Sequence, residues 1–214
     1  MIIIAASIIA AYLIGSINFA VIFTKVFKHT DIREHGSGNA GTTNAMRVGG
    51  FLPGMLTFIF DALKGFVACL LGKLSFDYVA PEIDAWWAVP LAGAYICGVA
   101  CIIGHVFPLF FKFRGGKGVA TCVGIFAVCC PVAIVAGLVV FALLTIISRY
   151  VSLGSLVATL VVVVLATVFR TVDTPAAIQI ICCAIMAVLI FYKHVSNIRR
   201  LIAGTENRVG NKTK

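Results

Sequence analysis

Long apolar runs separated by short polar segments dominate this chain. Five runs have the length and composition of membrane-spanning helices: residues 1–23, 51–73, 86–111, 156–172 and 176–193. A helix needs about 20 consecutive apolar residues to cross the hydrocarbon layer of a bilayer. The pattern therefore predicts a membrane protein with several transmembrane helices.

A sixth apolar run, residues 119–147, is too long for one ordinary span. As a single helix it would rise about 43 Å, whereas the hydrocarbon layer is about 30 Å thick. Pro131 lies near its middle, and proline lacks the amide hydrogen that a helix interior requires. We expect two short helices, about 119–130 and 132–147, joined by a turn near the outer surface.

The positive charges decide between six spans and seven. Cytoplasmic segments of membrane proteins carry an excess of Lys and Arg. With seven spans, the cytoplasmic segments are 24–50, 112–118, 148–155 and 193–214, and they hold 14 of the 17 cationic residues. With six spans, the C-terminal segment and its cations would be translocated. We therefore predict an all-α fold of seven transmembrane helices in a single domain, 1–214, with the N-terminus outside and the C-terminus in the cytoplasm.

Composition supports the membrane class. The chain is 61% apolar and 12% charged, with a mean hydropathy of +1.09, whereas a soluble domain is roughly half apolar and a quarter charged. The net charge is +9, and the cationic residues lie between apolar spans. This placement favours anionic lipids and anionic substrates over nucleic acid as partners. The eight cysteines all lie in apolar runs without the spacing of a metal site, so we expect them to fill packing space.

The first cytoplasmic segment contains a polar, glycine-rich motif that ends at Arg47. Its glycines allow consecutive backbone N–H groups to face one anion, and a short helix after them would add further amides. Arg47 supplies a planar guanidinium suited to phosphate. The motif favours a phosphate site over a flexible connector with a snorkelling arginine. The candidate binding residues are Ser37, Gly38, Asn39, Gly41, Thr43 and Asn44.

A second glycine-rich motif surrounds Lys117. Three glycines around one lysine are consistent with a backbone cradle that carries a point charge. Lys112 and Arg114 are interpreted as topology signals, and His105 as the donor of a structural hydrogen bond at a helix end. The candidate binding residues of this motif are Gly115, Gly116, Lys117 and Gly118.

Two further cytoplasmic segments carry weaker signals. Ser152 and Ser155 either belong to a site or cap the helix that follows them. His194 and Asn197 are three residues apart and so share a helix face. An imidazole therefore lies beside an amide at the membrane surface, although a plain basic surface helix would show the same spacing.

The remaining charges and the missing motifs narrow the chemistry. Asp61 and Lys64 lie within a span, three residues apart, so a structural ion pair is as plausible as a catalytic role. No cytoplasmic segment carries a carboxylate cluster for Mg²⁺, and no serine or cysteine has recognisable histidine and acid partners. The pattern favours a reaction between two phosphate-bearing compounds, one of them delivered from the bilayer. An anion transporter is the alternative, but transporters place such residues near the membrane midplane.

In these motifs the sequence resembles the bacterial acyl-phosphate-dependent glycerol-3-phosphate acyltransferases. The resemblance covers nearly the whole chain. No histidine is followed five residues later by aspartate, a pair typical of the thioester-dependent acyltransferases. The matching segments are 12–17, 36–47, 104–121, 149–155 and 194–206.

The resemblance implies transfer of an acyl chain from acyl phosphate to the 1-hydroxyl of glycerol 3-phosphate. The products are lysophosphatidic acid and phosphate, in the first step of bacterial phospholipid synthesis. It implies no cofactor, no metal and no use of acyl-CoA or acyl carrier protein. It also implies a place in the cytoplasmic (inner) membrane with the site facing the cytoplasm, and the enzyme that makes acyl phosphate as a candidate partner. The expected catalytic residues are Arg47, Lys117, Ser152, His194 and Asn197, with Ser155 among the binding residues.

Overall fold

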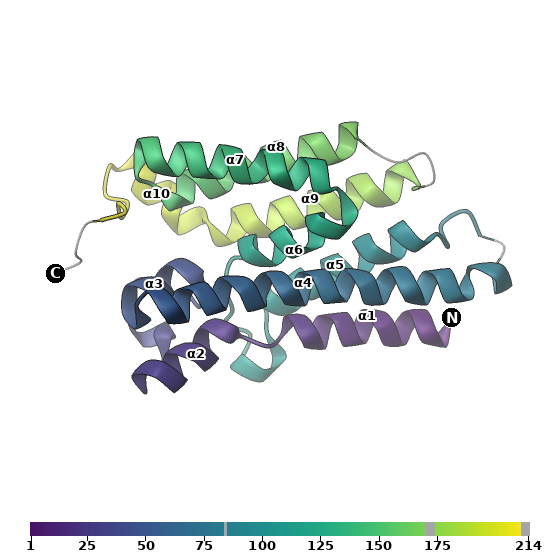
Figure 1. Cartoon of the computed structure of the whole chain (residues 1–214), viewed down its shortest axis with the longest axis horizontal. Coiled ribbons are helices and arrows are strands. Elements are labelled where there is room, and N and C mark those ends of the chain that lie inside the picture. The colour runs from purple at the N-terminus through teal and green to yellow at the C-terminus, as the bar shows by residue number, and fades with distance from the viewer. Residues whose placement is uncertain (84, 170–173, 211–214) are drawn as a thin grey trace.

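The helices run along one long axis. The computed structural model describes residues 1–83, 85–169 and 174–210. All the regular elements in these residues are helices, which confirms the all-α class. The N-terminus lies at one end of the long axis and the helix Val195–Ile202 lies at the other (Figure 1). The α-helices are α1 (Ile2–Gly15), α2 (Phe19–Lys28), α3 (Thr42–Gly49), α4 (Phe51–Val79), α5 (Pro90–Val106), α6 (Val119–Cys129), α7 (Pro131–Ser148), α8 (Val151–Val168), α9 (Ala176–Lys193) and α10 (Val195–Ile202). Short 3₁₀ turns cover Ile32–Glu34 (η1), Ala80–Glu82 (η2) and Leu109–Phe111 (η3).

Six segments of the described chain are long and apolar enough to cross a membrane, and α6 is shorter. With 11 residues, α6 rises about 17 Å. The predicted break at Pro131 is confirmed, and α7 matches the expected range 132–147 within one residue at each end. With 18 residues, however, α7 is long enough to cross a membrane and is not a short helix. The six segments are Ile2–Lys28, Phe51–Glu82, Pro90–Phe111, Pro131–Ser148, Val151–Val168 and Ala176–Lys193.

The predicted spans differ from the helices mainly at their ends. The run 176–193 is α9 as expected, whereas the helix expected at 156–172 begins earlier, at Val151. The predicted end of that run falls on 170–173, outside the described residues, as do the last four positions of the cytoplasmic segment 193–214.

The first apolar run forms two helices rather than one. α1 ends at Gly15 and α2 begins at Phe19. The side chain of Asn18 caps α2 by accepting a hydrogen bond of 3.2 Å from the amide of Val21. Lys64 Nζ of α4 donates to the Ile17 carbonyl over 2.7 Å. A backbone oxygen that a continuous helix would have satisfied is thus paired by a buried cation.

Helices approach one another closely where both carry small residues. A Cβ added at Gly72 of α4 would lie 2.1 Å from the Gly93 carbonyl oxygen, and one at Gly93 would lie 2.4 Å from that of Gly72. At Gly124 of α6, an added Cβ would lie 1.8 Å from the Ala62 oxygen of α4. Backbone contact through small residues is typical of helix packing in membranes.

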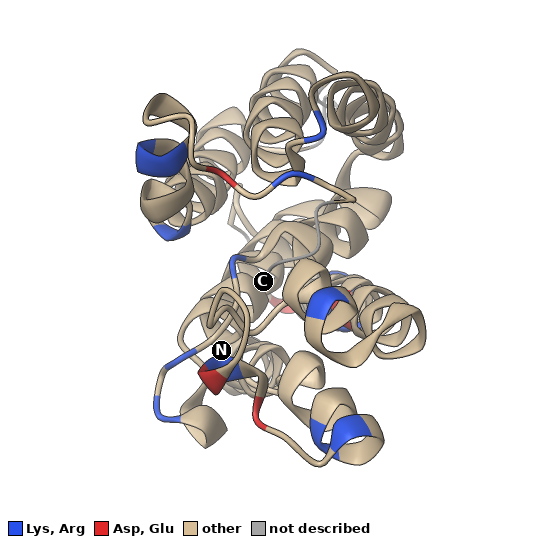
Figure 2. Ribbon diagram, turned by 90° about the vertical axis from the view of Figure 1, so that its left-hand side faces the viewer, with Lys and Arg blue, Asp and Glu red and all other residues tan. Residues whose placement is uncertain are grey.

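The helices form two groups with α6 between them (Figure 1). α4 packs against α1, α5 and α6, while α7 packs on α8, and α9 contacts both α8 and α5. Figure 2 views one end of this bundle and shows Lys and Arg gathered there over several elements. The charged end therefore brings together segments that are far apart in the sequence.

Candidate active site

A cavity of 710 Å³ lies between the two helix groups. Its polar part is formed by the loop before α3, by α3, by the loop before α6, by the first turns of α8 and by residues 194–210. Its apolar part runs between α6, α7, α8 and α9. A cavity with these two parts fits a ligand with a charged head and an apolar chain. The apolar wall includes Phe126, Ile134, Phe141, Val162 and Met186.

The first glycine-rich loop is organised by the buried side chain of Asn44. Its Oδ1 accepts the amide hydrogen of Ser37 over 3.0 Å, and its Nδ2 donates to the carbonyls of Ile32 (3.2 Å) and His35 (2.9 Å). A buried side chain that satisfies three backbone groups fixes the path of a loop. Arg47, one turn further along α3, lines the cavity from this fixed base.

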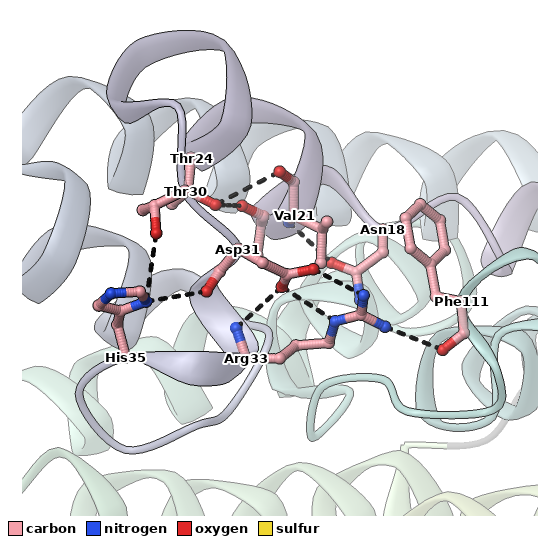
Figure 3. Close-up of polar contacts among 9 residues, drawn as sticks. Asn18, Val21, Thr24, Thr30, Asp31, Arg33, His35 and Phe111 are labelled. Atoms are coloured by element: carbon pink, nitrogen blue, oxygen red, sulfur yellow. Dashed lines mark hydrogen bonds and ion pairs between the residues drawn. The ribbon is translucent and has the colours of Figure 1, made fainter.

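A second set of contacts ties this loop to the turn after α5. The guanidinium of Arg33 pairs with Asp31, with 2.7 Å between Nη2 and Oδ2, and Nη1 donates to the Phe111 carbonyl over 3.0 Å (Figure 3). The hydrogen bond from Arg33 lowers the pKa of Asp31 to about 2. These contacts of Arg33 were not predicted from the sequence. Arg33 and Phe111 are separated by 78 residues, and no local spacing indicates that they meet.

The second glycine-rich loop is held by close packing. A Cβ at Gly115 would lie 1.9 Å from the His105 carbonyl oxygen. One at Gly116 would lie 2.3 Å from His105 Nε2 and 2.5 Å from the Ala40 oxygen. Both glycines are buried. Glycine is therefore needed at both positions because α5 and the first loop leave no room for a side chain. The sequence had suggested a different role for these glycines, namely an anion cradle.

Three buried ionisable side chains support this packing. Lys64 Nζ and Asp61 Oδ1 are 2.8 Å apart, which confirms the ion pair considered from the sequence. His105 Nδ1 lies 3.6 Å from the same carboxylate oxygen. Pairing offsets the cost of burying charges in a span. His105 thus links the ion pair of α4 to the loop that carries Lys117.

A carboxylate that the sequence analysis did not select connects the other elements of the site. Oε1 of Glu206 accepts hydrogen bonds from Ser152 Oγ (3.0 Å) and Asn197 Nδ2 (2.6 Å). Oε2 accepts one from Arg200 Nε over 2.7 Å. Lys117 Nζ in turn donates to Asn197 Oδ1. Glu206 ends the matching segment 194–206 but was not among the candidate site residues, because its hydrogen bond to Ser152 joins segments 54 residues apart.

Burial shapes the protonation of two polar residues at the cavity. Burial lowers the pKa of Lys117 to about 8, although the Glu206 carboxylate opposes the shift. Burial, followed by the charge of Lys117, lowers the pKa of His194 to about 4. His194 Nδ1 lies 2.8 Å from the Ile190 carbonyl, which can only accept. Neutral His194 therefore carries its proton on Nδ1 and leaves the lone pair of Nε2 free for a ligand.

Most residues selected from the sequence line this one cavity. Ser152 and Ser155 do so from within α8, whose N-terminus has no side-chain cap, so they do not act as caps. Gly38, Gly115 and Gly116 do not line it. The selected residues that do are Ser37, Asn39, Gly41, Thr43, Asn44, Arg47, Lys117, Gly118, Ser152, Ser155, His194 and Asn197.

Fold and site together define an integral membrane protein with one cavity that has a large apolar part and a smaller polar part rich in cations. Residues 5–204 match the model of the glycerol-3-phosphate acyltransferase family, so the chain belongs to that family. This confirms the family expected from the motifs.

Curated relatives are similar in sequence to this chain over nearly its full length. The chain is 41% identical to the glycerol-3-phosphate acyltransferase of Halalkalibacterium halodurans over 96% of this chain and 95% of the relative. It is 42% identical to the glycerol-3-phosphate acyltransferase of Thermoanaerobacter sp. (strain X514) over 96% of each chain.

Two crystal structures of PlsY (YgiH), an integral membrane glycerol 3-phosphate acyltransferase, share the fold. The glycerol 3-phosphate form superposes with a TM-score of 0.83 at 36% identity, covering 97% of this chain and 96% of that one. The lysophosphatidic acid form gives 0.80 at 34% identity, covering 97% and 95%.

Proposed function

We propose that the protein transfers an acyl chain from acyl phosphate to the 1-hydroxyl of glycerol 3-phosphate. The products are lysophosphatidic acid and inorganic phosphate. The observation that carries this proposal is the cavity itself, because its cationic part and its apolar part are continuous. An acyl phosphate has a charged head and an apolar chain, and glycerol 3-phosphate adds a second small anion.

The charges of the cavity suit two phosphate groups. Both carboxylates among the described lining residues are already paired, Asp61 with Lys64 and Glu206 with Arg200. Arg47 and Lys117 have no acidic partner within ion-pair distance in the described chain. They are therefore available to hold the substrates and to stabilise the phosphate that leaves.

The proton of the glycerol hydroxyl goes to a substrate phosphate in this mechanism. The second pKa of a phosphate monoester is near 6, whereas the pKa of His194 is lowered to about 4. The phosphate is therefore the stronger base at neutral pH. Nε2 of His194 accepts a hydrogen bond from the hydroxyl and orients its oxygen toward the acyl carbon. The new C–O bond forms as the bond from the acyl carbon to the phosphate oxygen breaks.

The proposed donor is acyl phosphate rather than a thioester. An acyl phosphate is a mixed anhydride with an activated carbonyl, and its leaving group is an anion that Lys117 and Arg47 can neutralise. A thioester would release a thiol, which carries no phosphate charge for these cations to neutralise. Ser152 and Asn197, joined through Glu206, are assigned to positioning the acyl oxygen and the hydroxyl.

The proposed topology has seven passes, with the N-terminus outside and the charged end in the cytoplasm of the inner membrane. Positive charge marks the cytoplasmic side, and the N-terminus and α10 lie at opposite ends of the bundle (Figure 1). α6 and α7 then form one outward and one inward pass within a single domain, 1–214. The enzyme that makes acyl phosphate is the proposed partner at the charged end.

A donor comparison tests the proposal. Purified protein in vesicles is given glycerol 3-phosphate with either acyl phosphate or acyl-CoA of the same chain length. We expect lysophosphatidic acid and phosphate in equal amounts from acyl phosphate, and no lysophosphatidic acid from acyl-CoA. Comparable product from acyl-CoA, in a preparation free of transacylase, would refute the donor assignment.

A further inference from the structure

The turn between α5 and the second glycine-rich loop presents large apolar side chains to the outside. Leu109, Phe110 and Phe113 are 47%, 60% and 56% exposed. Phe111, by contrast, packs against the apolar cluster of α2 and the first loop. In this turn, Phe111 therefore points inward, whereas Leu109, Phe110 and Phe113 point outward.

The turn that carries these exposed side chains is held by several hydrogen bonds. The amides of Phe111 and Phe113 both donate to the Pro108 carbonyl, over 3.2 and 3.0 Å, and Arg33 holds the Phe111 carbonyl (Figure 3). Lys112 and Phe113 have φ angles of +56° and +57°, which bulky residues rarely adopt. Such a conformation persists only where the surroundings determine it.

Two cations alternate with the exposed rings. Lys112 and Arg114 are exposed, and neither has an acidic partner within ion-pair distance in the described chain. The segment 109–118 contains no acidic residue. The unpaired positive charge is complementary to anionic headgroups.

The end of α2 carries a similar arrangement of exposed side chains. Val26 and Phe27 are 63% and 42% exposed, between the exposed cations Lys25 and Lys28. Apolar side chains flanked by Lys and Arg are typical of segments that lie in a membrane interface. Two separate elements thus share one surface chemistry.

The length of α5 places the turn at the depth of such an interface. α5 has 17 residues and so rises about 26 Å, close to the hydrocarbon thickness of about 30 Å. The residues that directly follow α5 therefore lie near the bilayer surface.

We propose that the turn 109–114 and the end of α2 bind a bilayer surface that carries anionic headgroups. Leu109, Phe110 and Phe113 enter the boundary of the acyl chains, and Lys112 and Arg114 contact headgroup phosphates. The turn is three residues from Lys117, so lipid binding also fixes the base of the second loop.

Tryptophan fluorescence tests insertion without any need for turnover. Phe110→Trp is made with Trp86→Phe and Trp87→Phe, so that it is the single tryptophan, and placed in vesicles that contain lipids brominated near the headgroup. Thr205→Trp in the same background is the control in the exposed tail. We expect the tryptophan at 110 to lose most of its emission to the brominated lipid and the one at 205 to lose it to aqueous iodide. Phe113→Trp repeats the measurement if the first variant folds poorly.

The lipid charge is tested with the same proteins. Quenching at 110 should be stronger in vesicles of phosphatidylcholine with phosphatidylglycerol than in phosphatidylcholine alone. Lys112→Gln with Arg114→Gln should remove that difference. Iodide quenching at 110 equal to that at 205 would overturn insertion. Equal quenching by bromine in both vesicles would overturn the anionic partner. Protection from both quenchers would overturn insertion and indicate contact with a second copy of this chain.

Discussion

The two glycine-rich loops of this site look alike in sequence but are built differently. The first loop takes its shape from the side chain of Asn44, which satisfies three backbone groups, and Gly38 beside it is exposed with φ +69°. In the second loop, Gly115 and Gly116 are buried against His105. Gly38 thus permits a turn, whereas Gly115 and Gly116 permit close backbone contact. A glycine-rich motif alone therefore does not indicate which residues touch a ligand.

Removing the cation of either loop should have the largest effect on rate. We expect Lys117→Ala and Arg47→Ala each to lower kcat/KM by roughly 10²-fold or more, because each side chain stabilises phosphate charge in the transition state. Steady-state kinetics on variants with wild-type elution and thermal unfolding measures this loss. Wild-type rates in both variants would contradict the phosphate role.

Alanine at a glycine should separate the two loops. Gly116→Ala places a Cβ 2.3 Å from His105 Nε2, so we expect a large loss of thermal stability and activity. Gly38→Ala has its nearest neighbour at 3.4 Å and a positive φ, so it should cost only about 1 kcal/mol. Gly38→Asn, which tolerates the left-handed region, is the control and should lie nearer to wild type. Equal losses of stability and activity in Gly116→Ala and Gly38→Ala would contradict the different roles assigned to these glycines.

The scaffolds of the two loops should respond differently to truncation. Asn44→Ala leaves buried backbone groups of the first loop without partners, at a cost of about 1–3 kcal/mol. Asp61→Ala leaves Lys64 buried without its carboxylate, at a cost of about 3–5 kcal/mol. The free energy of unfolding in a membrane-mimetic detergent provides the comparison. A smaller loss for Asp61→Ala than for Asn44→Ala would contradict the ordering.

The pH dependence of kcat/KM should report the protonation state of Lys117 in the second loop. The pKa of Lys117 in the free protein is lowered to about 8, and only the protonated amine neutralises phosphate. Activity should therefore fall as pH rises through about 8, and a substrate phosphate that must be deprotonated sets the acid limb near 6. Lys117→Arg should move the alkaline limb upward, because arginine stays protonated. An unchanged alkaline limb in that variant would assign it to another group.

Chelation should have the smallest effect. No cluster of three or more His, Cys, Asp or Glu suited to a metal occurs in the part of the chain that the structure describes. We expect EDTA-treated and untreated protein to show the same rate in the assay with acyl phosphate. A loss of activity restored by Mg²⁺ would show that one of the loops binds phosphate through a metal.

The membrane helices were predictable because they depend on local composition. The run 176–193 and the break at Pro131 follow from apolar length and from the missing proline amide. The division of the first run at 16–18 was not predictable. It depends on Lys64 satisfying a carbonyl 47 residues away.

The site was predictable where motifs carry its chemistry. Arg47, Lys117 and Asn197 lie in local patterns of glycine, cation and amide. Glu206 and His105 were not assigned their partners, because their contacts come from segments that meet only in the folded bundle. Long-range pairing, rather than residue type, is what the sequence alone did not reveal.

The central claim is that the 1-hydroxyl oxygen of glycerol 3-phosphate attacks the acyl carbon while the two loops hold the phosphates. The most direct test uses glycerol 3-phosphate labelled with ¹⁸O at that hydroxyl, together with acyl phosphate, and mass spectrometry of the products. The account predicts ¹⁸O in the ester of lysophosphatidic acid and unlabelled phosphate in equal amount. Free fatty acid with a doubly phosphorylated glycerol would mean attack at phosphorus, and would contradict the account.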